Sequence, residues 1–394
     1  MLTILCVATY LKGDAFLREC KRLGATVLLL TADKLKDAAW PREAIDEIHT
    51  IPRGAGDAAV RAAVGRIARR HRLDRIAALD DFDVETGAML REFFQAPGFD
   101  RAVAARFRDK LTMRTTARRL GIPVPAFVPV FTDAEVAAWI ERVPPPWVLK
   151  PRSSAAATGI KKVRTAAELW PALEATGDER PLFLLEQFVS GEVYHVDTIV
   201  RHGEVVFAAA SKYGRPPMQV AHEGGVFVTR RLEAASPEAR SVLDVNRRLL
   251  TGFGLPNGVS HTEFIGGADG VAFLETSARV GGAYIVDVIA AASGINLWRE
   301  WAKLELAGED GAYDPPRDSG RFAGIALTLA RQEEPDTSAY ADPEIVTRIR
   351  KHHHAGLIVA ADTADRVDAL LSDYTARFHA DFVATMPAPD RPVE

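Results

Sequence analysis

The chain has 394 residues, of which 47% are apolar and 26% are charged, and its formal net charge at pH 7 is −4. These values are typical of an ordinary globular protein with two or three domains. No basic block is long enough to indicate nucleic-acid binding, and no apolar run approaches the roughly 18 residues of a membrane-spanning helix. We therefore expect neither nucleic acid nor a membrane as a partner.

The chain has only two cysteines, Cys6 and Cys20, and their spacing is not that of metal ligands. So low a count is typical of a protein from a reducing compartment. The first residues, MLTILCVATYLKG, lack the basic start and the cleavage site of a signal peptide, so a first β-strand explains them better. We expect a cytoplasmic protein.

Residues 1–100 alternate between strand and helix patterns. Strands are predicted for TILCVA, TVLLLTA and RIAALDD, and helices for AFLRECKRLG and AAVRAAVGRIARRHR. This alternation predicts an α/β domain with a parallel sheet. The first strand is not followed by G-x-G-x-x-G, which argues against a dinucleotide-dependent dehydrogenase.

The rest of the chain mixes helices with further strands. Asp109 can cap a helix that ends at Gly121, and the prolines that follow favour an extended exit. Strands are predicted for WVLKP, 182–187, 193–200, 205–210, RFAGIALTLA and GLIVAA, and helices for 134–141, 283–292 and TADRVDALLSDYTARFHADF.

The segment SHTEFIGGADGVAFLETSARVGG, residues 260–282, predicts two strands joined by a Gly/Asp turn. If Ile265 pairs with Val271 across a five-residue loop, Glu263 and Glu275 are diagonal neighbours on one face. Their Cα atoms would then lie about 7–8 Å apart. A four-residue loop would instead place the two glutamates on opposite faces.

Strand alternation after Glu275 places Ser277 and Arg279 on that same face. Two carboxylates beside an arginine are suited to holding Mg²⁺ and, through it, phosphate oxygens. A solvated sheet face with an ion pair would explain the same pattern without any site.

Two further segments are suited to binding a nucleotide. In WVLKPRSSAAATGIKKV, Lys150 ends a buried strand before a loop of small residues, 153–159, whose N–H groups could approach phosphate. In LFLLEQFVSGEVYHVD, an edge strand could meet the adenine edge, with Glu186 and Glu192 near an amino group or ribose hydroxyls. Each segment can also be explained as a plain hairpin with exposed charges.

The order of these motifs carries more information than any one of them. DK…GIPVP, WVLKP with its small-residue loop, LEQFVSGE and HTEF…FLETSAR-x-GG follow one another along the chain. This series resembles the ATP-grasp superfamily, and within it the carboxylate–amine ligases that include amino-acid and dipeptide ligases. The resemblance covers about residues 1–310.

The resemblance implies an ATP-grasp fold of mixed α/β and α+β class, with ATP between two antiparallel sheets. The expected domains are an N-terminal parallel α/β domain over 1–108, an ATP-grasp domain over 109–309 and a small C-terminal domain over 310–394. The lid of the ATP-grasp domain is expected at about 123–190.

The resemblance also implies roles for individual residues. Lys110 and Lys150 match the lysines that contact ATP phosphates, and Lys212 resembles a further one. The remaining matches are Glu186, Phe188 and Val189 for the adenine hinge, Glu192 for ribose, Glu263 and Glu275 for the metal, and Arg279 for the transferred phosphate. One departure is Ser277, which stands where the family usually has an asparagine as third metal ligand.

The implied activity is ATP-dependent amide or peptide bond formation through an acyl phosphate, with release of ADP and phosphate. The cofactors would be ATP and Mg²⁺, with Mn²⁺ as an alternative ion, and the partners a small carboxylate and an amine, with a homodimer left open. His222, Glu223 and His261 are candidates on the substrate side. The alternatives are another ATP-grasp enzyme, such as a carboxylase or a nucleotide-pathway ligase, or a non-catalytic ATP-binding regulatory protein.

Overall fold

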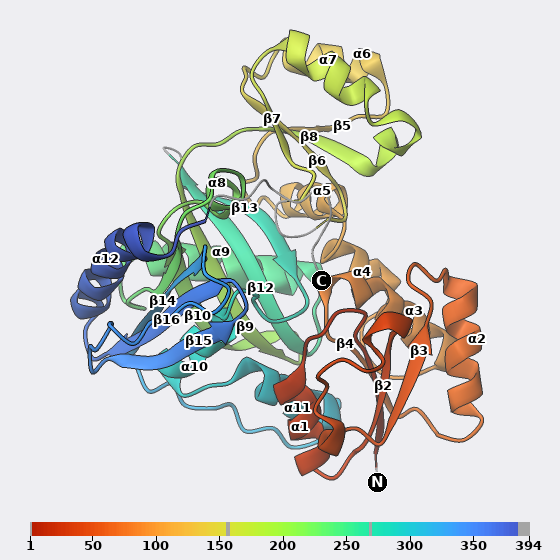
Figure 1. The fold of residues 1–394 in the computed structure, drawn as a ribbon. Coiled ribbons are helices and arrows are strands. Elements are labelled where there is room, and N and C mark those ends of the chain that lie inside the picture. The colour runs from red at the N-terminus through yellow and green to blue at the C-terminus, as the bar shows by residue number, and fades with distance from the viewer. Residues whose placement is uncertain (1, 155–157, 268–269, 385–394) are drawn as a thin grey trace.

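The computed structural model describes residues 2–154, 158–267 and 270–384, which form three lobes, each built on a β-sheet (Figure 1). Parts of the predicted phosphate loop and of the Gly/Asp turn, residues 155–157 and 268–269, lie outside the described residues. None of the described helices combines the length and the apolar character needed to cross a membrane.

The N-terminal lobe is a four-stranded parallel sheet in the order β3-β2-β1-β4, which confirms the predicted α/β start. Its strands are β1 (Thr3–Val7), β2 (Thr26–Ala32), β3 (Glu47–Ile51) and β4 (Arg75–Ala78). The helices are α1 (Asp14–Arg22), α2 (Asp57–Ala68) and α3 (Val84–Phe94), followed by α4 (Arg101–Arg106). Both faces of the sheet are apolar because helices cover both of them.

The central lobe is an eight-stranded sheet in the order β13-β12-β9-β10-β11-β14-β16-β15, with antiparallel neighbours throughout. The strands are β9 (Glu192–Arg201), β10 (Glu204–Tyr213), β11 (Phe227–Arg231), β12 (Gly258–Gly267), β13 (Gly270–Ser277), β14 (Phe322–Leu329), β15 (Ile345–Lys351) and β16 (His354–Ala361). The strands after residue 310 therefore extend the sheet of the preceding region. The predicted domain limits stay a prediction.

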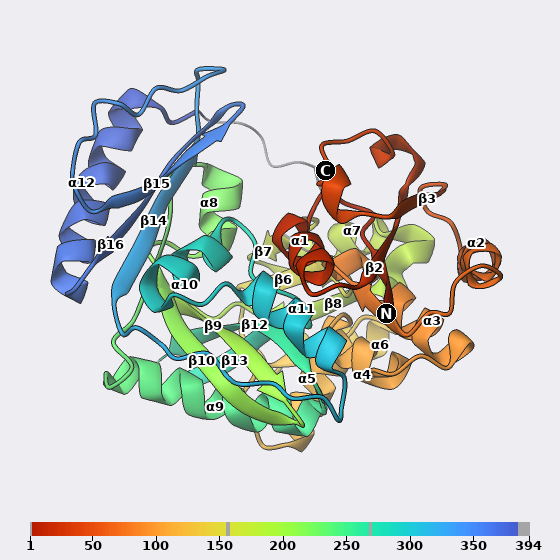
Figure 2. The same cartoon turned by 90° about the horizontal axis from the view of Figure 1, so that it is seen from below.

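Helices cover this large sheet on both faces. Helix α9 (Pro237–Phe253) packs on one face of β9 and β10, and α10 (Ile285–Ser293) and α11 (Leu297–Ala307) lie on the other. Figure 2 shows α11 between the large sheet and α1 of the N-terminal lobe, where the two helices share an apolar core. Helix α12 (Ala364–Asp381) packs against β14 and β16.

The lid lobe is an antiparallel sheet in the order β5-β8-β6-β7, drawn above the other two lobes in Figure 1. It contains β5 (Phe127–Pro129), β6 (Trp147–Pro151), β7 (Lys161–Val163) and β8 (Phe183–Gln187). Helices α6 (Asp133–Ile140) and α7 (Ala166–Glu174) pack on the face that carries Trp147 and Leu149. Strand alternation places Val148 and Lys150 on the other face.

Two short helices lie beside the lid. Helix α5 (Lys110–Arg119) begins where the Asp109 carboxylate accepts the N–H of Leu111, which confirms the predicted cap. The helix ends before Gly121, whose φ of 67° closes the last turn as a left-handed residue can. Helix α8 (Pro217–Glu223) follows β10 and contributes to the same cavity as β7.

Candidate active site

The two glutamates face one another directly across β12 and β13. The pairing begins with Gly267 opposite Gly270 and continues to Phe264 opposite Phe273, and it then shifts so that Glu263 lies opposite Glu275. The extra residue, Leu274, forms a β-bulge. The predicted pairing of Ile265 with Val271 is wrong, because Ile265 pairs with Ala272.

The predicted shared face of the two acids is nevertheless confirmed. Without the bulge, Glu263 would pair with Leu274, and Glu275 would point to the opposite face of the sheet. Because Leu274 adds one residue to β13, the side chain of Glu275 points to the same face as that of Glu263. Two carboxylates that share a face on paired strands supply the oxygen ligands that Mg²⁺ takes, so this donor set fits the ion.

Two lysines place positive charge beside the acids. The Nζ atom of Lys110 lies 3.0 Å from Oε2 of Glu275 and also donates to the carbonyl of Ser154, 2.6 Å away. The partial enclosure of Glu275 by itself would raise its pKa, but the charges of Lys110 and Lys150 outweigh this and hold the pKa well below its usual range. Glu275 therefore stays ionised at neutral pH.

Lys150 is buried in an ion-pair group with Glu186 and Arg114. Its Nζ atom lies 2.6 Å from Oε2 of Glu186, and Nε of Arg114 lies 2.6 Å from Oε1 of the same carboxylate. Burial lowers the pKa of Lys150 to about 8, against the opposing charge of Glu186. The carboxylate of Glu186 thus holds a lysine in place. The predicted edge strand is wrong here, because β8 lies between β5 and β6 and Glu186 pairs with Phe127 and Val148.

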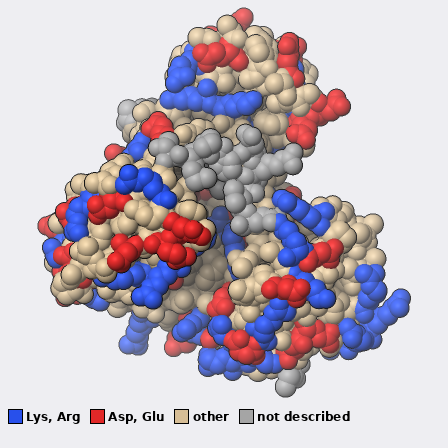
Figure 3. Space-filling model, viewed as in Figure 1, with Lys and Arg blue, Asp and Glu red and all other residues tan. Residues whose placement is uncertain are grey.

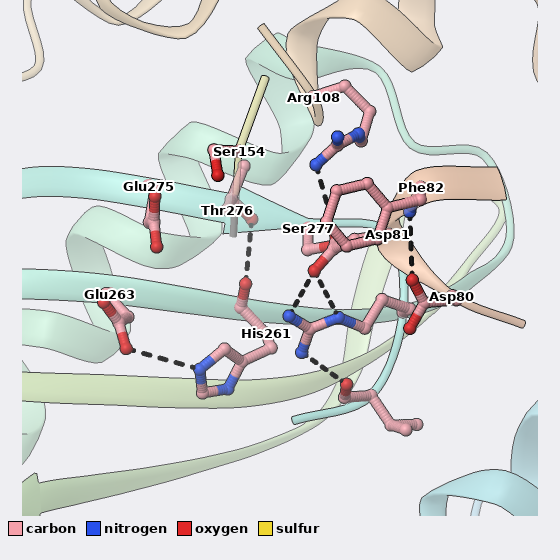
Figure 4. A network of polar contacts seen from close by, with 12 residues as sticks. Asp80, Asp81, Phe82, Arg108, Ser154, His261, Glu263, Glu275, Thr276 and Ser277 are labelled. Carbon is pink, nitrogen blue, oxygen red and sulfur yellow. Dashed lines mark hydrogen bonds and ion pairs between the residues drawn. The ribbon is translucent and has the colours of Figure 1, made fainter. Parts of the chain in front are cut away.

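A carboxylate from the N-terminal lobe reaches the end of β13, as Figure 4 shows. Asp81, in the turn after β4, accepts hydrogen bonds from Nε of Arg279 at 2.8 Å, from Nη2 of Arg279 and from the hydroxyl of Ser277. Arg108 approaches Asp81 to 4.0 Å and donates to the carbonyl of Ser153 at 2.6 Å. Burial by itself would raise the pKa of Asp81, but the charges of Arg279 and Arg108 hold it well below its usual range.

Asp81 was missed by the sequence reasoning. Its position could have indicated a role, because Asp81 directly follows the predicted strand residues RIAALD and ligand-contacting residues gather at the carboxyl ends of parallel strands.

A chain of buried polar groups lies beneath Glu263 on the same sheet face. His195 and His261 each hydrogen-bond Asp197 through Nδ1, at 2.7 and 2.9 Å. Nε2 of His261 lies 3.7 Å from Oε1 of Glu263, and that oxygen also accepts a hydrogen bond from the hydroxyl of Tyr213 at 2.8 Å. Burial opposes the charge on His261, but Asp197 outweighs it and raises the pKa of His261 to about 9.

The predicted hinge residues lie at the end of β8. The backbone N–H of Phe188 already donates to the carbonyl of Pro146 at 3.0 Å. Val189 packs against the main apolar core. The ring of Phe188 faces a cation, because Nζ of Lys162 lies 3.4 Å from the ring centroid. Lys162 pairs with Val148 and so shares the sheet face of Lys150.

The structure does not bring Lys212 to the acid pair. Tyr213 points to the face of Glu263, so the preceding residue points to the opposite face. There Lys212 lies 3.5 Å from Glu192 and 3.4 Å from Glu238 of helix α9. The predicted ribose acid and the predicted third phosphate lysine therefore pair with each other, away from Glu275.

A cavity of about 530 Å³ lies between the lid and helix α8. Its lining includes Lys161, Lys162, Phe188, His222 and Glu223. His222 and Glu223, the candidates for the substrate side, thus lie opposite the lid strand β7, whereas His261 lies beside Glu263. The surface in Figure 3 shows basic side chains gathered along the lower edge of the lid lobe, which faces the rest of the molecule.

Comparisons with known proteins support the predicted family. Residues 107–283 match the model of the ATP-grasp domain family. The chain is 27% identical over 243 residues to the L-arginine-specific L-amino acid ligase of Bacillus subtilis, an alignment that covers 59% of this chain and 58% of the relative. The chain spans about six-tenths of the length of the first curated relatives it matches.

Two solved structures superpose on nearly the whole chain. The L-amino acid ligase of Bacillus licheniformis superposes with a TM-score of 0.76 at 18% identity and 97% and 98% coverage of the two chains. The N5-carboxyaminoimidazole synthetase of Staphylococcus aureus, complexed with ADP, superposes with a TM-score of 0.72 at 13% identity and 94% and 96% coverage. Residues 107–283 therefore form an ATP-grasp domain. The predicted family and fold are thereby confirmed.

Proposed function

We propose that this ATP-grasp protein is an ATP-dependent carboxylate–amine ligase. The observation that supports the proposal best is the acid pair Glu263 and Glu275, which shares one site with Lys110, Lys150 and Arg279. A triphosphate with its metal ion requires carboxylate ligands for the metal and cationic side chains for the phosphates in the same site.

The basic residues would bind the phosphates, and the acidic residues would bind the metal ion. Lys110 and Lys150 would contact the phosphates of ATP, and Arg279 would neutralise the phosphoryl group in transfer. Glu263 and Glu275 would hold Mg²⁺, which supplies further charge neutralisation at the phosphate oxygens. Phe188 and Val189 would lie along the base, and the further roles predicted for Glu192 and Lys212 require contacts that the two residues do not make in this structure.

The proposed reaction has two steps. An oxygen of the substrate carboxylate attacks the γ-phosphorus, the bond to the β–γ bridging oxygen breaks, and ADP leaves with an acyl phosphate formed. The amine nitrogen then attacks the acyl carbon, the carbon–oxygen bond to phosphate breaks, and the nitrogen loses a proton as the amide forms. Exclusion of water protects the acyl phosphate from hydrolysis.

The named relative favours amino acids as substrates. The Bacillus subtilis relative is an L-arginine-specific L-amino acid ligase, which supports an L-amino acid as the carboxylate or the amine here. Fold similarity to a carboxyaminoimidazole synthetase supports the second candidate, a ligase of nucleotide pathways, at the level of fold alone.

A screen for ADP and amide formation tests the proposal. Purified protein is incubated with ATP, Mg²⁺ and pairs of amino acids, and products are identified by mass spectrometry. We expect ADP, phosphate and one dipeptide in equal amounts, and loss of all three in Glu275→Gln. ADP formation that depends on bicarbonate or on a phosphorylated amine, without dipeptide, would favour the second candidate. ATP binding without turnover under any condition would leave a regulatory protein.

A further inference from the structure

We propose that Asp81 is a positioning residue for Arg279, and that Ser277 serves this contact and is not a ligand of the metal. The N-terminal lobe would thus complete the phosphoryl-transfer site. This inference rests on the proposed function, and it changes the role that the family pattern implies for Ser277.

The contacts leave the guanidinium little freedom. Nε and Nη2 of Arg279 both donate to Oδ2 of Asp81, and Nη1 donates to the carbonyl of Val280 at 2.6 Å. These bonds use three of the five N–H groups of the arginine, so two remain for a ligand. Asp81 is only 6% exposed, and it lies 198 positions from Arg279 in the sequence. A buried charge-assisted contact of this kind fixes orientation as well as charge.

The same carboxylate engages Ser277. The hydroxyl of Ser277 donates to Oδ1 of Asp81, and the serine itself is 6% exposed. Its neighbour on the same sheet face, Glu275, is two residues away, or about 6.6 Å along a strand. A side chain with one methylene group cannot contact Asp81 and reach into the acid pair at once. Serine therefore fits the contact with the N-terminal lobe.

Asparagine would not reproduce this arrangement. Its amide is larger than a hydroxymethyl group, and the space at Ser277 is bounded by Asp81 and the buried strand pair with His261. The departure from the family pattern at Ser277 is thus accompanied by an acid that accepts its hydroxyl. On this account Glu263 and Glu275 are the protein's metal ligands on this sheet face.

Four variants test the proposal: Asp81→Asn, Ser277→Ala, Ser277→Asn and a matched control, Asp83→Asn. Asp83 is buried in the same turn, but its carboxylate accepts hydrogen bonds from Thr9. For Asp81→Asn we expect kcat for ADP formation to fall about 10- to 100-fold, because a displaced Arg279 loses its alignment. The Kd of a non-hydrolysable ATP analogue should change less than about threefold, and the control should change neither value by more than about threefold.

Metal binding separates the two roles of Ser277 without turnover. The Kd for Mn²⁺, measured by electron paramagnetic resonance with the ATP analogue bound, should stay within about twofold of wild type in Ser277→Ala. Ser277→Asn should lower kcat without lowering the Mg²⁺ concentration needed for half-maximal activity. A weakening of Mn²⁺ binding by about tenfold or more in Ser277→Ala, or a lower Mg²⁺ requirement in Ser277→Asn, would overturn the proposal for Ser277.

A double-mutant cycle tests the coupling. Asp81→Asn and Arg279→Lys should be strongly non-additive in kcat, because each removes the same contact. Additive effects would overturn the positioning role. Amide formation by the wild type tests the proposed function separately, since ADP formation and Mn²⁺ binding compare each variant with wild type whatever the product is.

Discussion

Replacement of Lys150 by methionine should weaken ATP binding selectively. Lys150 is 8% exposed and lies on the face of the lid sheet that helices α6 and α7 do not cover. Loss of a charge-assisted contact to phosphate costs about 1.5–3 kcal/mol, which corresponds to an increase of about 10- to 150-fold in Kd. Methionine keeps most of the length of the lysine side chain, and Glu186 retains its ion pair with Arg114 in this variant. The variant should therefore fold.

Isothermal titration with a non-hydrolysable ATP analogue at pH 7 measures this effect. Lys161→Met and Lys162→Met are the matched controls, because both residues are exposed on the adjacent strand β7. Lys162 shares the sheet face of Lys150, whereas Lys161 does not. Both controls should change Kd by less than about fivefold, as expected for solvated charges. Equal effects at the three lysines would refute the reasoning.

The pH dependence gives a second check on Lys150. With a pKa of about 8, this lysine is mostly charged at pH 7 and mostly neutral at pH 9. The charged fraction falls about tenfold over that interval, so wild-type affinity for the analogue should fall by about the same factor. Lys150→Arg should remove this fall, because arginine stays charged. A wild-type Kd that is constant from pH 7 to 9 would show that the lysine does not bind phosphate in its charged form.

Three further predictions concern the acids and one glycine. Glu275→Gln should abolish ADP formation, because the amide keeps the shape but lacks the charge, and it should lower the melting temperature, because Lys110 loses its ion pair; near-normal turnover would exclude a metal ligand. Burial raises the pKa of Asp83 to about 6, so its contribution to stability is present below pH 4 and lost as pH rises through 6. Between pH 4 and 7, the free energy of unfolding of Asp83→Asn, measured in urea, should therefore rise by up to about 3 kcal/mol relative to that of the wild type. The same pH dependence in the two proteins would contradict this. A Cβ atom at Gly281 would lie 2.9 Å from Oδ1 of Asp197, so Gly281→Ala should lower stability by about 1–3 kcal/mol; an unchanged melting temperature would show that the neighbours yield freely.

Local pattern was enough to predict the parallel N-terminal sheet and the shared face of the two glutamates. It was not enough for the register, because a β-bulge adds one residue without a distinct signature in the sequence. Leu274 is apolar, as a regular strand residue would be, and only the paired strand reveals that it has no partner. The correct face was thus predicted with the wrong pairing, since a five-residue loop and a shorter connection with a bulge produce the same side-chain phase.

Contacts between distant segments were harder to predict. Asp81 and Arg279 meet only because the carboxyl end of β4 lies against the end of β13, and no local periodicity encodes that approach. The position of Lys212 was missed for a related reason. Its motif resembles the family pattern, but the face of a strand is decided by its neighbours, and Tyr213 occupies the face of Glu263.

Each cation of the site is held by a carboxylate from another segment. Lys110 pairs with Glu275, Lys150 with Glu186 and Arg279 with Asp81. An unpaired buried charge is costly, so these pairs keep the site stable before a nucleotide arrives. The three pairs should respond differently when a nucleotide binds. Lys150 and Arg279 can receive phosphate oxygens while their acids stay in place, because Glu186 and Asp81 are buried more deeply than the cations they hold.

Glu275 is different, because it is also a proposed metal ligand and its side chain is 38% exposed. Lys110 and a metal ion would compete for the same carboxylate. We therefore expect Lys110 to turn from Glu275 to phosphate as the metal–nucleotide complex binds, so that one exchange of partners satisfies the lysine, the acid and the triphosphate together. Nucleotide and metal should accordingly bind cooperatively, with Glu275 as the residue that couples them.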